Sequence, residues 1–525
     1  MKQLRSWGPW IAGGLIVAAV MAVLDAQGAP GVAFLAYAVI SLVGVGLLWL
    51  AWNVVDGENA PRAVGIAVIT AVLLRLVVSV GLFKALPVYG YDEKPQRAGY
   101  VYYDAYARDS DAWARARSDK PLLASFEQRT ATDQYGGLLF VSASIHRYLS
   151  EGAHRPLTVA LLTVAVSTTA VIFAWGAGAM RFGKGAAILA AWIVALYPDY
   201  VLLGASQMRE AFLVPALGIG LYAYARARIG ALRSAAALGT VAFGLAVLIS
   251  PPFALLMTAV LVTAWFWEQR GLPRRILLGL IVLVVLAGAA LALTSQAWSG
   301  VQGLDASNLP ALLFGWLQEG AEFQLYELER GSGWVQKLFE LTPGWAHLPL
   351  ATLYGLSQPF LPAAIADNSG APIWRAIAIF RAVGWFALLP FLLYAPLAAL
   401  RASGLRSIQT YFALIVWLGA LLGSYRAAGD LWDNPRYRAG FLVIQAVLAG
   451  WAWMHAKRAE SPWLWRTAVL VLGGALVWLQ WYLGRYYGTP RLNLNETLLL
   501  TAAAAAAWLL GSWWWDRRSP TARPA

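Results

Sequence analysis

The sequence predicts an all-α polytopic membrane protein with about fourteen transmembrane helices, joined by extracytoplasmic loops that carry short surface helices. Two observations predict this class. Hydrophobic residues make up 60% of the 525 positions and charged residues only 13%, which is more apolar surface than a soluble chain of this length can hide. Apolar windows of about 20 residues, the length that a helix needs to cross the hydrocarbon core, also recur along the chain.

The apolar windows place the predicted spans in order. They are 8–26, 31–54, 62–86, 156–179, 184–200, 206–227, 233–250, 252–269, 275–294, 374–398, 406–424, 439–456, 463–485 and 494–516. Segment 346–365 is also apolar, but its prolines predict a broken segment that does not cross the membrane. Segment 136–150 is too short to cross and is predicted to lie flat on the outer surface.

Clusters of basic residues orient the predicted spans. Lys2 and Arg5 place the N-terminus in the cytoplasm, because basic residues accumulate on that side. Later clusters fall on the same side if the spans are right, and these are Arg181/Lys184, Arg226/Arg228/Arg233, Arg270/Arg274/Arg275, Arg401/Arg406, Lys457/Arg458 and Arg517/Arg518. We therefore expect a multi-pass protein of the inner (plasma) membrane, with both termini cytoplasmic and loops 87–155 and 295–373 outside.

Composition excludes several classes of function. The net charge of +13 comes from clusters between spans and not from a long basic run, so nucleic acid is not an expected partner. The chain has no cysteine, which excludes disulfides, thiolate metal sites and cysteine nucleophiles. No P-loop is present, and the cytoplasmic loops are too short for a nucleotide-binding domain.

The segment 87–133 stands out because it is polar. It holds eight acids and seven bases, although the whole chain has only 27 acids. A loop that concentrates carboxylates beside apolar spans is a candidate functional site.

Four short motifs carry a resemblance to a known family. They are YYD at 102–104 with the stretch to Trp113, DQYGG at 133–137, SQMRE at 206–210 and NPRYR at 434–438. With the acidic outer loop and the many spans, they make the chain resemble the GT-C superfamily of membrane glycosyltransferases. The bacterial protein O-mannosyltransferase and lipid A aminoarabinose transferase branch is most similar, and the likeness covers roughly residues 62–457.

The resemblance implies transfer of a sugar from a polyprenyl-phosphate donor to an extracytoplasmic acceptor, which is a lipid, glycan or protein. An aspartate of the first outer loop would act as base, and basic side chains would hold the lipid phosphate. On this interpretation residues 1–60 form two additional N-terminal helices and residues 61–457 the catalytic module. Residues 458–525 then form C-terminal helices and a basic cytoplasmic tail.

Three loop aspartates are candidates for the base, in the order Asp104, Asp109 and Asp92. Glycosyl transfer needs a base near the acceptor hydroxyl or amine, and one carboxylate opposite a leaving phosphate suits an inverting reaction. Asp104 follows Tyr102 and Tyr103, whose rings are candidates to stack on a sugar. Asp92 lies in the nearest match to the family's Asp-Glu pair.

The loop acids also suit structural or metal-binding roles. Asp104, Arg108, Asp111 and Arg115 recur at helical steps, so they could form a self-paired, solvated helix face. A divalent cation (Mg²⁺, Mn²⁺ or Ca²⁺) bridging two of the loop acids is a further option. Asp133 is a candidate for substrate binding, but it also suits an N-cap of the segment that follows.

Three arginines are candidates for the donor phosphate. Arg436 and Arg438 open a late span on the outer side, where the topology rule disfavours arginine, and arginine binds phosphate well. Their alternative partners are Asp430 and Asp433. Arg209 begins another span and is predicted to grip the phosphate, with Glu210 orienting it; the alternative is that Arg209 reaches to the interface.

Arg75 and the histidines carry weaker signals. Arg75 lies in mid-span and needs a partner there, either structural or functional. The histidines show no spacing typical of zinc, and His146 and His154 are expected at the surface. Alternative functions are a secondary transporter or lipid flippase, and an O-antigen-ligase or polymerase-like enzyme whose active loop would be 295–345.

Overall fold

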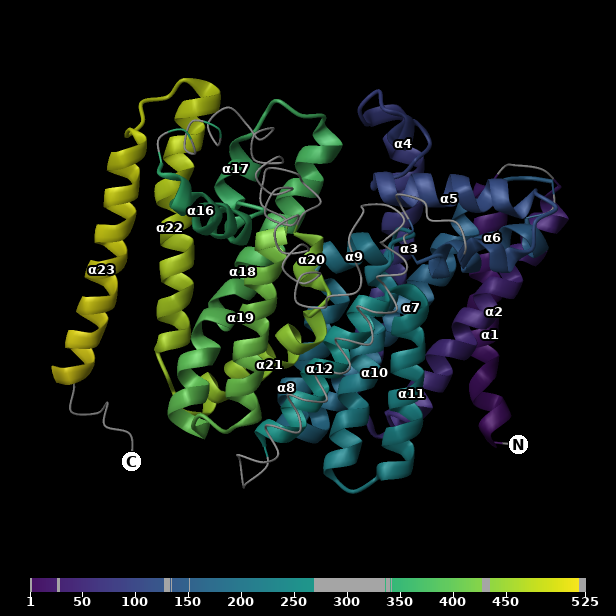
Figure 1. Ribbon diagram of the computed structural model, residues 1–525, viewed down its shortest axis with the longest axis horizontal. Coiled ribbons are helices and arrows are strands. Elements are labelled where there is room, and N and C mark those ends of the chain that lie inside the picture. Colours follow the sequence, from purple (N-terminus) through teal and green to yellow (C-terminus); the bar gives the residue numbers. More distant parts are fainter. Residues whose placement is uncertain are drawn as a thin grey trace, which may run out of the picture.

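Apolar segments of this length fold as helices because lipid offers no partner to a backbone N–H or C=O group. The computed structural model describes residues 2–25, 29–126, 133, 135–150, 152–268, 336, 340, 342–426 and 435–518, and all regular secondary structure within these ranges is helical. The long helices run side by side, and most of the short helices lie toward one end of the molecule (Figure 1).

The long helices form two groups along the chain. The N-terminal group is α1 (Lys2–Leu24), α2 (Pro30–Val54), α3 (Arg62–Tyr89), α7 (Pro156–Phe182), α8 (Lys184–Leu196), α10 (Glu210–Arg228), α11 (Leu232–Ile249) and α12 (Pro251–Trp267). The C-terminal group is α18 (Pro372–Ser403), α19 (Ile408–Arg426), α21 (Leu442–Arg458), α22 (Trp463–Tyr487) and α23 (Leu494–Arg518). Helix α21 packs against α8 and joins the two groups.

The short helices are α4 (Lys94–Arg97), α5 (Tyr103–Ala116), α6 (Gly137–Leu149), α9 (Pro198–Gly204), α16 (Gly344–Ser357), α17 (Leu361–Ala366) and α20 (Arg436–Ala439). In Figure 1, α4, α5, α6, α16 and α17 lie toward the upper end. The start of α1 and the end of α23 lie toward the lower end. The two ends of the described chain thus share one face, opposite the short helices.

The predicted spans coincide with helices wherever the structure describes them. Among the described residues, seven helices are long and apolar enough to cross a membrane, and the number is eight if α8 and α9, bent by 58°, count as one span. The all-helical, multi-span class is therefore confirmed, while the number fourteen stays a prediction. The predicted span 275–294 lies outside the described residues.

The segment 346–365 is broken, as its prolines predict. Helix α16 has 14 residues and α17 has six, so neither has the length of a span. Arg438 stabilises the break between them, because its guanidinium donates to the backbone carbonyls of Leu356 and Gln358.

The first two helices are joined to the rest by buried polar contacts. Asp25, just after α1, accepts from the guanidinium of Arg155 at 2.9 Å and from the hydroxyl of Tyr37 at 2.9 Å. Tyr222 of α10 donates to the carbonyl of Val54 at 3.0 Å. Residues 1–60 are therefore in polar contact with Arg155, which directly precedes α7, and with α10. The division of these residues from the rest of the chain as a separate unit stays a prediction.

Arg75 finds its partners in the backbone. Its guanidinium donates to the carbonyls of Val194 at 3.0 Å and Ala195 at 3.2 Å, and it lies over the ring of Tyr200. Pro198 has no N–H group to offer the carbonyl of Val194, so the α8–α9 break leaves that acceptor open. The mid-span arginine thus caps the C-terminal end of α8, which is a structural role.

Candidate active site

A carboxylate from the polar segment 87–133 meets an arginine at the start of α20. Helix α5 begins after Tyr102 and carries Asp104 in its first turn, where the helix dipole favours an acid. The guanidinium of Arg436, at the start of α20, donates to Asp104 Oδ2 at 2.9 Å. Glu210, the first residue of α10, brings its Oε1 to 3.9 Å from Arg436 Nε. Three distant segments of the chain therefore place two carboxylates around one guanidinium.

The Asp104–Arg436 pair is accessible to solvent. The side chain of Asp104 is 30% exposed and that of Arg436 is 10% exposed. Glu210 is half-buried, and its enclosed Oε2 atom has no hydrogen-bond partner among the described residues. The site thus has a solvent-facing acid backed by charges that protein surrounds, and charges in such surroundings interact more strongly than they would in water.

A second ion pair lies beside the first. Arg381 of α18 donates to Asp199 of α9, and both side chains are buried. The hydroxyl of Tyr102 lies in the field of this pair and of Arg436 and Glu210. Burial is the largest influence on that hydroxyl and raises its pKa well above the usual value, so Tyr102 stays protonated.

The other predicted phosphate ligands are placed differently from Arg436. Arg438 is buried, with its guanidinium 3.7 Å from the ring centre of Trp385 and bonded to backbone carbonyls. Arg209 is half-buried and lies over the ring of Tyr135, at 5.7 Å from its centre. Only Arg436 of these three forms an ion pair with a candidate base in the part of the chain that the structure describes.

The side chains predicted to bind substrate differ in their exposure to solvent. Tyr103 is 65% exposed, whereas Tyr102 is buried, so only Tyr103 presents its ring to solvent. Asp133 is buried and accepts from the backbone N–H of Leu139 at 2.7 Å. It also lies 3.8 Å from Arg108 Nε. Gly136, and not Asp133, is the N-cap residue of α6, but the Asp133 carboxylate accepts from an N–H group of the first turn of that helix, which is a helix-capping contact. A role of Asp133 in substrate binding stays a prediction.

Asp92 and Asp109 lie apart from each other. Asp92 is exposed and pairs with its neighbour Arg97. Asp109 is buried, and it bonds to the hydroxyl of Tyr100 at 2.6 Å and to ring nitrogens of His146 and His154. A cation bridging two of the candidate bases finds no support in these contacts, because Asp92, Asp104 and Asp109 each have different partners.

The expectation that His146 lies at the surface is wrong. Its side chain is fully buried and bonds to Asp109 at 2.9 Å. His154 reaches the same carboxylate at 2.6 Å and is 29% exposed. The sequence hid this cluster because α6 ends between the two histidines, and the following turn folds His154 back onto α5.

Arg381 and Asp199 are site residues that no sequence motif marked. Arg381 lies within an apolar span, and an ionisable group in such a position usually has a function or a buried partner. Asp199 follows the Tyr-Pro turn at 197–198. The signal that could have found Arg381 was its charge in an apolar segment, as it was for Arg75.

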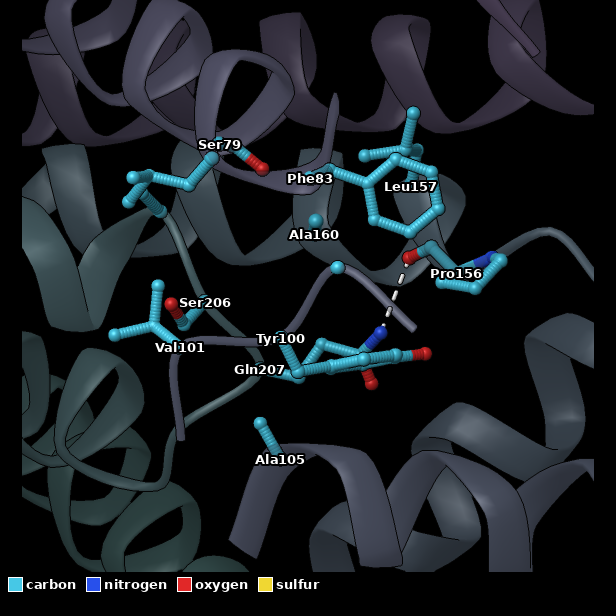
Figure 2. Close-up of a pocket in the computed structure, with 13 residues that line it drawn as sticks. Ser79, Phe83, Tyr100, Val101, Ala105, Pro156, Leu157, Ala160, Ser206 and Gln207 are labelled. Atoms are coloured by element: carbon cyan, nitrogen blue, oxygen red, sulfur yellow. Dashed lines mark hydrogen bonds between the residues drawn. The ribbon is translucent and has the colours of Figure 1, made fainter. Parts of the chain in front are cut away.

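Two cavities lie near these residues. One, of about 410 Å³, borders Arg381, Pro435, Trp374 and Tyr91, and the rings of Trp374 and Tyr91 are stacked. The other, of about 30 Å³, lies between α3, α5 and the start of α7 and is shown in Figure 2, where Gln207 donates to the carbonyl of Pro156 at 3.1 Å. The smaller cavity has room for a water molecule but not for a sugar.

Several solved chains match this one, and two of them cover most of its length. One is the archaeal oligosaccharyltransferase AglB from Archaeoglobus fulgidus in complex with an inhibitory peptide and a dolichol-phosphate, at 14% identity and a TM-score of 0.38, over 84% of this chain and 54% of that chain. The other is the oligosaccharyltransferase of the same organism in the apo form, at 14% identity and a TM-score of 0.37, over 87% and 58% of the two chains.

This chain therefore spans little more than half the length of those enzymes. No protein-family model and no curated protein matches the sequence. At this identity and TM-score the likeness assigns no activity, so we base the proposed function on the residues of the site itself.

Proposed function

We propose that this protein is a membrane glycosyltransferase that moves a sugar from a polyprenyl-phosphate donor to an extracytoplasmic acceptor. The acceptor is a lipid, a glycan or a protein with a free hydroxyl or amine. The single observation that carries the proposal is the meeting of Asp104 and Arg436 at 2.9 Å in a solvent-accessible position. These are the leading candidate for the base and a candidate for the phosphate ligand.

The chemistry needs both groups. Asp104 takes the proton from the acceptor hydroxyl or amine as the acceptor oxygen or nitrogen forms a bond to the anomeric carbon. The bond between that carbon and the phosphate oxygen breaks, and its electron pair leaves with the polyprenyl phosphate. A guanidinium at the phosphate stabilises this charge as it develops. One base and a phosphate leaving from the opposite side of the sugar give inversion.

The ion pair implies an order of events. Asp104 occupies the guanidinium of Arg436 in this structure, at a distance of 2.9 Å. A donor phosphate would therefore compete with Asp104 for Arg436. Binding of the donor would release the carboxylate of Asp104 and leave it free to act as base, so that the base becomes available when the donor is present.

The neighbouring groups are given supporting roles. Glu210 orients the guanidinium of Arg436 from the side of the Arg436 Nε atom, whereas Asp104 bonds to a terminal nitrogen of that guanidinium. Arg209 offers a second cation at the start of α10, because no carboxylate among the described residues lies within ion-pair distance of it. Arg438 and the Arg381–Asp199 pair hold the α16–α17 break and α9 in place. The exposed ring of Tyr103 is assigned to stacking on the sugar.

The cavity of about 410 Å³ suits the donor. Its aromatic wall of Trp374 and Tyr91 offers apolar surface to a sugar ring or to the first prenyl units, and Arg381 and Arg375 line it. Pro435 borders it directly before Arg436, so a lipid in this cavity would bring its phosphate toward that guanidinium. The basic clusters favour an extracytoplasmic position for this end of the molecule.

A transporter function has less support. Transporters place their functional charges near the middle of the bilayer, on broken helices. Arg75 is such a charge, but it is bonded to backbone carbonyls of α8. The ligase-like alternative depends on loop 295–345, nearly all of which lies outside the described residues.

Sugar transfer in membranes tests the proposal. Membranes from cells that overproduce the full chain are incubated with a panel of radiolabelled polyprenyl-phosphate sugars, and loss of label from the donor is measured. We expect turnover of at least one donor, and a fall of about 10²–10⁴-fold in kcat for Asp104→Asn. Asp119→Asn, an exposed acid of the same loop, is the control and should keep full turnover. Full turnover in Asp104→Asn would show that another group is the base.

A further inference from the structure

The cluster around Asp109 is built like a metal site. One carboxylate oxygen of Asp109 and one ring nitrogen each of His146 and His154 lie within 4.8 Å of one another. His146 Nε2 lies 2.9 Å from Oδ1 of Asp109, and His154 Nε2 lies 2.6 Å from Oδ2. Adjacent ligands around a zinc ion at bond lengths of about 2 Å lie about 3 Å apart, so these atoms need to move little to share one ion.

The surroundings of the cluster hold the ligands in place. The second ring nitrogen of His146 lies 3.4 Å from the hydroxyl of Ser150, which orients the ring. The ring of Trp113 stacks on His154 and meets His146 edge-on. Tyr100 donates to Asp109 at 2.6 Å. Metal-binding histidines commonly have a hydrogen-bond partner on the ring nitrogen that does not bind the metal, as His146 has in Ser150.

We propose that Asp109, His146 and His154 bind one Zn²⁺ ion, with solvent as the remaining ligand. The carboxylate supplies one negative charge and the imidazoles supply two nitrogens, a set that zinc favours. Mg²⁺ and Ca²⁺ prefer sites made of oxygens alone. His154 is 29% exposed, which gives the ion a path from solvent and room for a water ligand.

The ion would join three segments of the outer loop. Asp109 lies on α5, His146 on α6, and His154 in the turn before α7. Asp104 precedes Asp109 on the same helix by five residues, so a fixed α5 also fixes the position of Asp104. The zinc site is thus structural, and it stands whether or not the chain transfers sugars.

The test uses the full chain, purified in detergent and stripped with a chelator. The protein is dialysed against micromolar ZnSO₄, and zinc per chain is measured by mass spectrometry, with thermal unfolding measured in parallel. We expect one zinc per chain and a higher apparent Tm in wild type. His154→Gln should lose both effects, and His455→Gln, which removes a distant histidine at the end of α21, should keep both. MgCl₂ alone should have no effect.

X-ray absorption of the zinc-loaded wild type supplies a readout that needs no variant. Two imidazole nitrogens in the zinc shell, with oxygen ligands, support the proposal. A shell without imidazole overturns it, as does zinc retained equally by wild type and His154→Gln. Failure of wild type to retain zinc overturns it as well, and would show that hydrogen bonds alone hold the three side chains.

Discussion

Asp104 and Arg436 are 332 residues apart in the chain, and their side chains meet at 2.9 Å. Each partly neutralises the other, and Glu210 adds a second carboxylate 3.9 Å from the Nε of the same guanidinium. If a donor phosphate takes the place of Asp104 beside Arg436, the two residues act in different steps. Loss of the arginine should therefore change donor binding, while loss of the acid should change the chemical step.

The first prediction concerns Arg436→Gln. We expect the KM for the polyprenyl-phosphate donor to rise by about tenfold or more, because a hydrogen bond to a charged group contributes about 1.5–3 kcal/mol. The lost cation also leaves the charges of Asp104 and Glu210 uncompensated, which raises the electrostatic cost of bringing in a phosphate. The measurement is the initial rate of sugar transfer against donor concentration.

Arg401→Gln is the matched control for this experiment. Arg401 is exposed in the last turn of α18, so its loss should leave the donor KM unchanged. An unaltered donor KM in Arg436→Gln would remove that residue from the phosphate site. Equal changes in both variants would point to a general effect of surface charge.

The parts of this site that the sequence predicted are those with a local signal. The polar segment 87–133 stands out from the apolar chain, and it contains Asp104. Arg436 stands out because arginine is disfavoured on the outer side. The all-helical class and the broken segment at 346–365 follow equally from local composition and from prolines.

The parts that the sequence could not predict depend on distant contacts. His146 and His154 meet at Asp109 only because α6 ends and the chain turns back, and no helical period reveals that turn. Arg381 and Asp199 come from separate helices, α18 and α9, and pair only once these helices pack. The position of Arg75 in an apolar span shows that this residue needs a partner. The sequence does not show which partner, because the partner is the C-terminal end of a distant helix, α8.

The second prediction concerns Gly137, the first residue of α6. A Cβ atom there would lie 1.7 Å from the carbonyl oxygen of Leu248, at the end of α11, and backbone cannot yield as a flexible side chain can. Gly137→Ala should therefore displace α6 and lower the apparent Tm by several degrees or more. Thermal unfolding of purified protein in detergent measures this change.

Gly239→Ala separates this contact from the general effect of replacing glycine. Gly239 lies within α11 with no atom within 4 Å of an added Cβ. Alanine favours a helix over glycine by about 1 kcal/mol, so this variant should keep or slightly raise the Tm. A Gly137→Ala protein as stable as Gly239→Ala would mean that α6 does not pack against α11 in this way.

The third prediction concerns the contact between Gly204 and Arg75. A Cβ atom on Gly204 would lie 2.7 Å from Arg75 Nε and 2.6 Å from the hydroxyl of Ser167. Gly204→Ala should push the guanidinium away from the carbonyls of Val194 and Ala195. The expected loss of stability is about 1–3 kcal/mol for each buried carbonyl left without a donor.

A double-mutant cycle checks that Arg75 is the cause. Arg75→Leu alone should lower the Tm, because the same carbonyls lose their donor. Gly204→Ala in the Arg75→Leu background should then cost less than it does in wild type, since the contact with the guanidinium has gone and only the contact with Ser167 remains. Gly46→Ala, with nothing within 4 Å of the added Cβ, is the neutral control. If the losses of stability in the two single variants add up strictly in the double variant, Gly204→Ala does not act through Arg75.

The fourth prediction concerns Asp25, which ties the first two helices to the rest. Asp25→Asn keeps the shape of the side chain and its acceptor oxygen for Tyr37, but removes the charge that faces the buried guanidinium of Arg155. Removing one partner of a buried ion pair typically costs about 3–5 kcal/mol. We therefore expect a marked fall in apparent Tm, measured on the purified full chain.

Asp56→Asn is the control for that change. Asp56 is exposed after α2, and its φ of 57° is one that asparagine adopts readily, so its replacement should leave the Tm unchanged. If Asp25→Asn is as stable as this control, the buried pair does not hold residues 1–60 to the turn before α7. A fall confined to Asp25→Asn would show that these two helices are an integral part of the fold, because the charge of Asp25 matters only where Arg155 is buried against it.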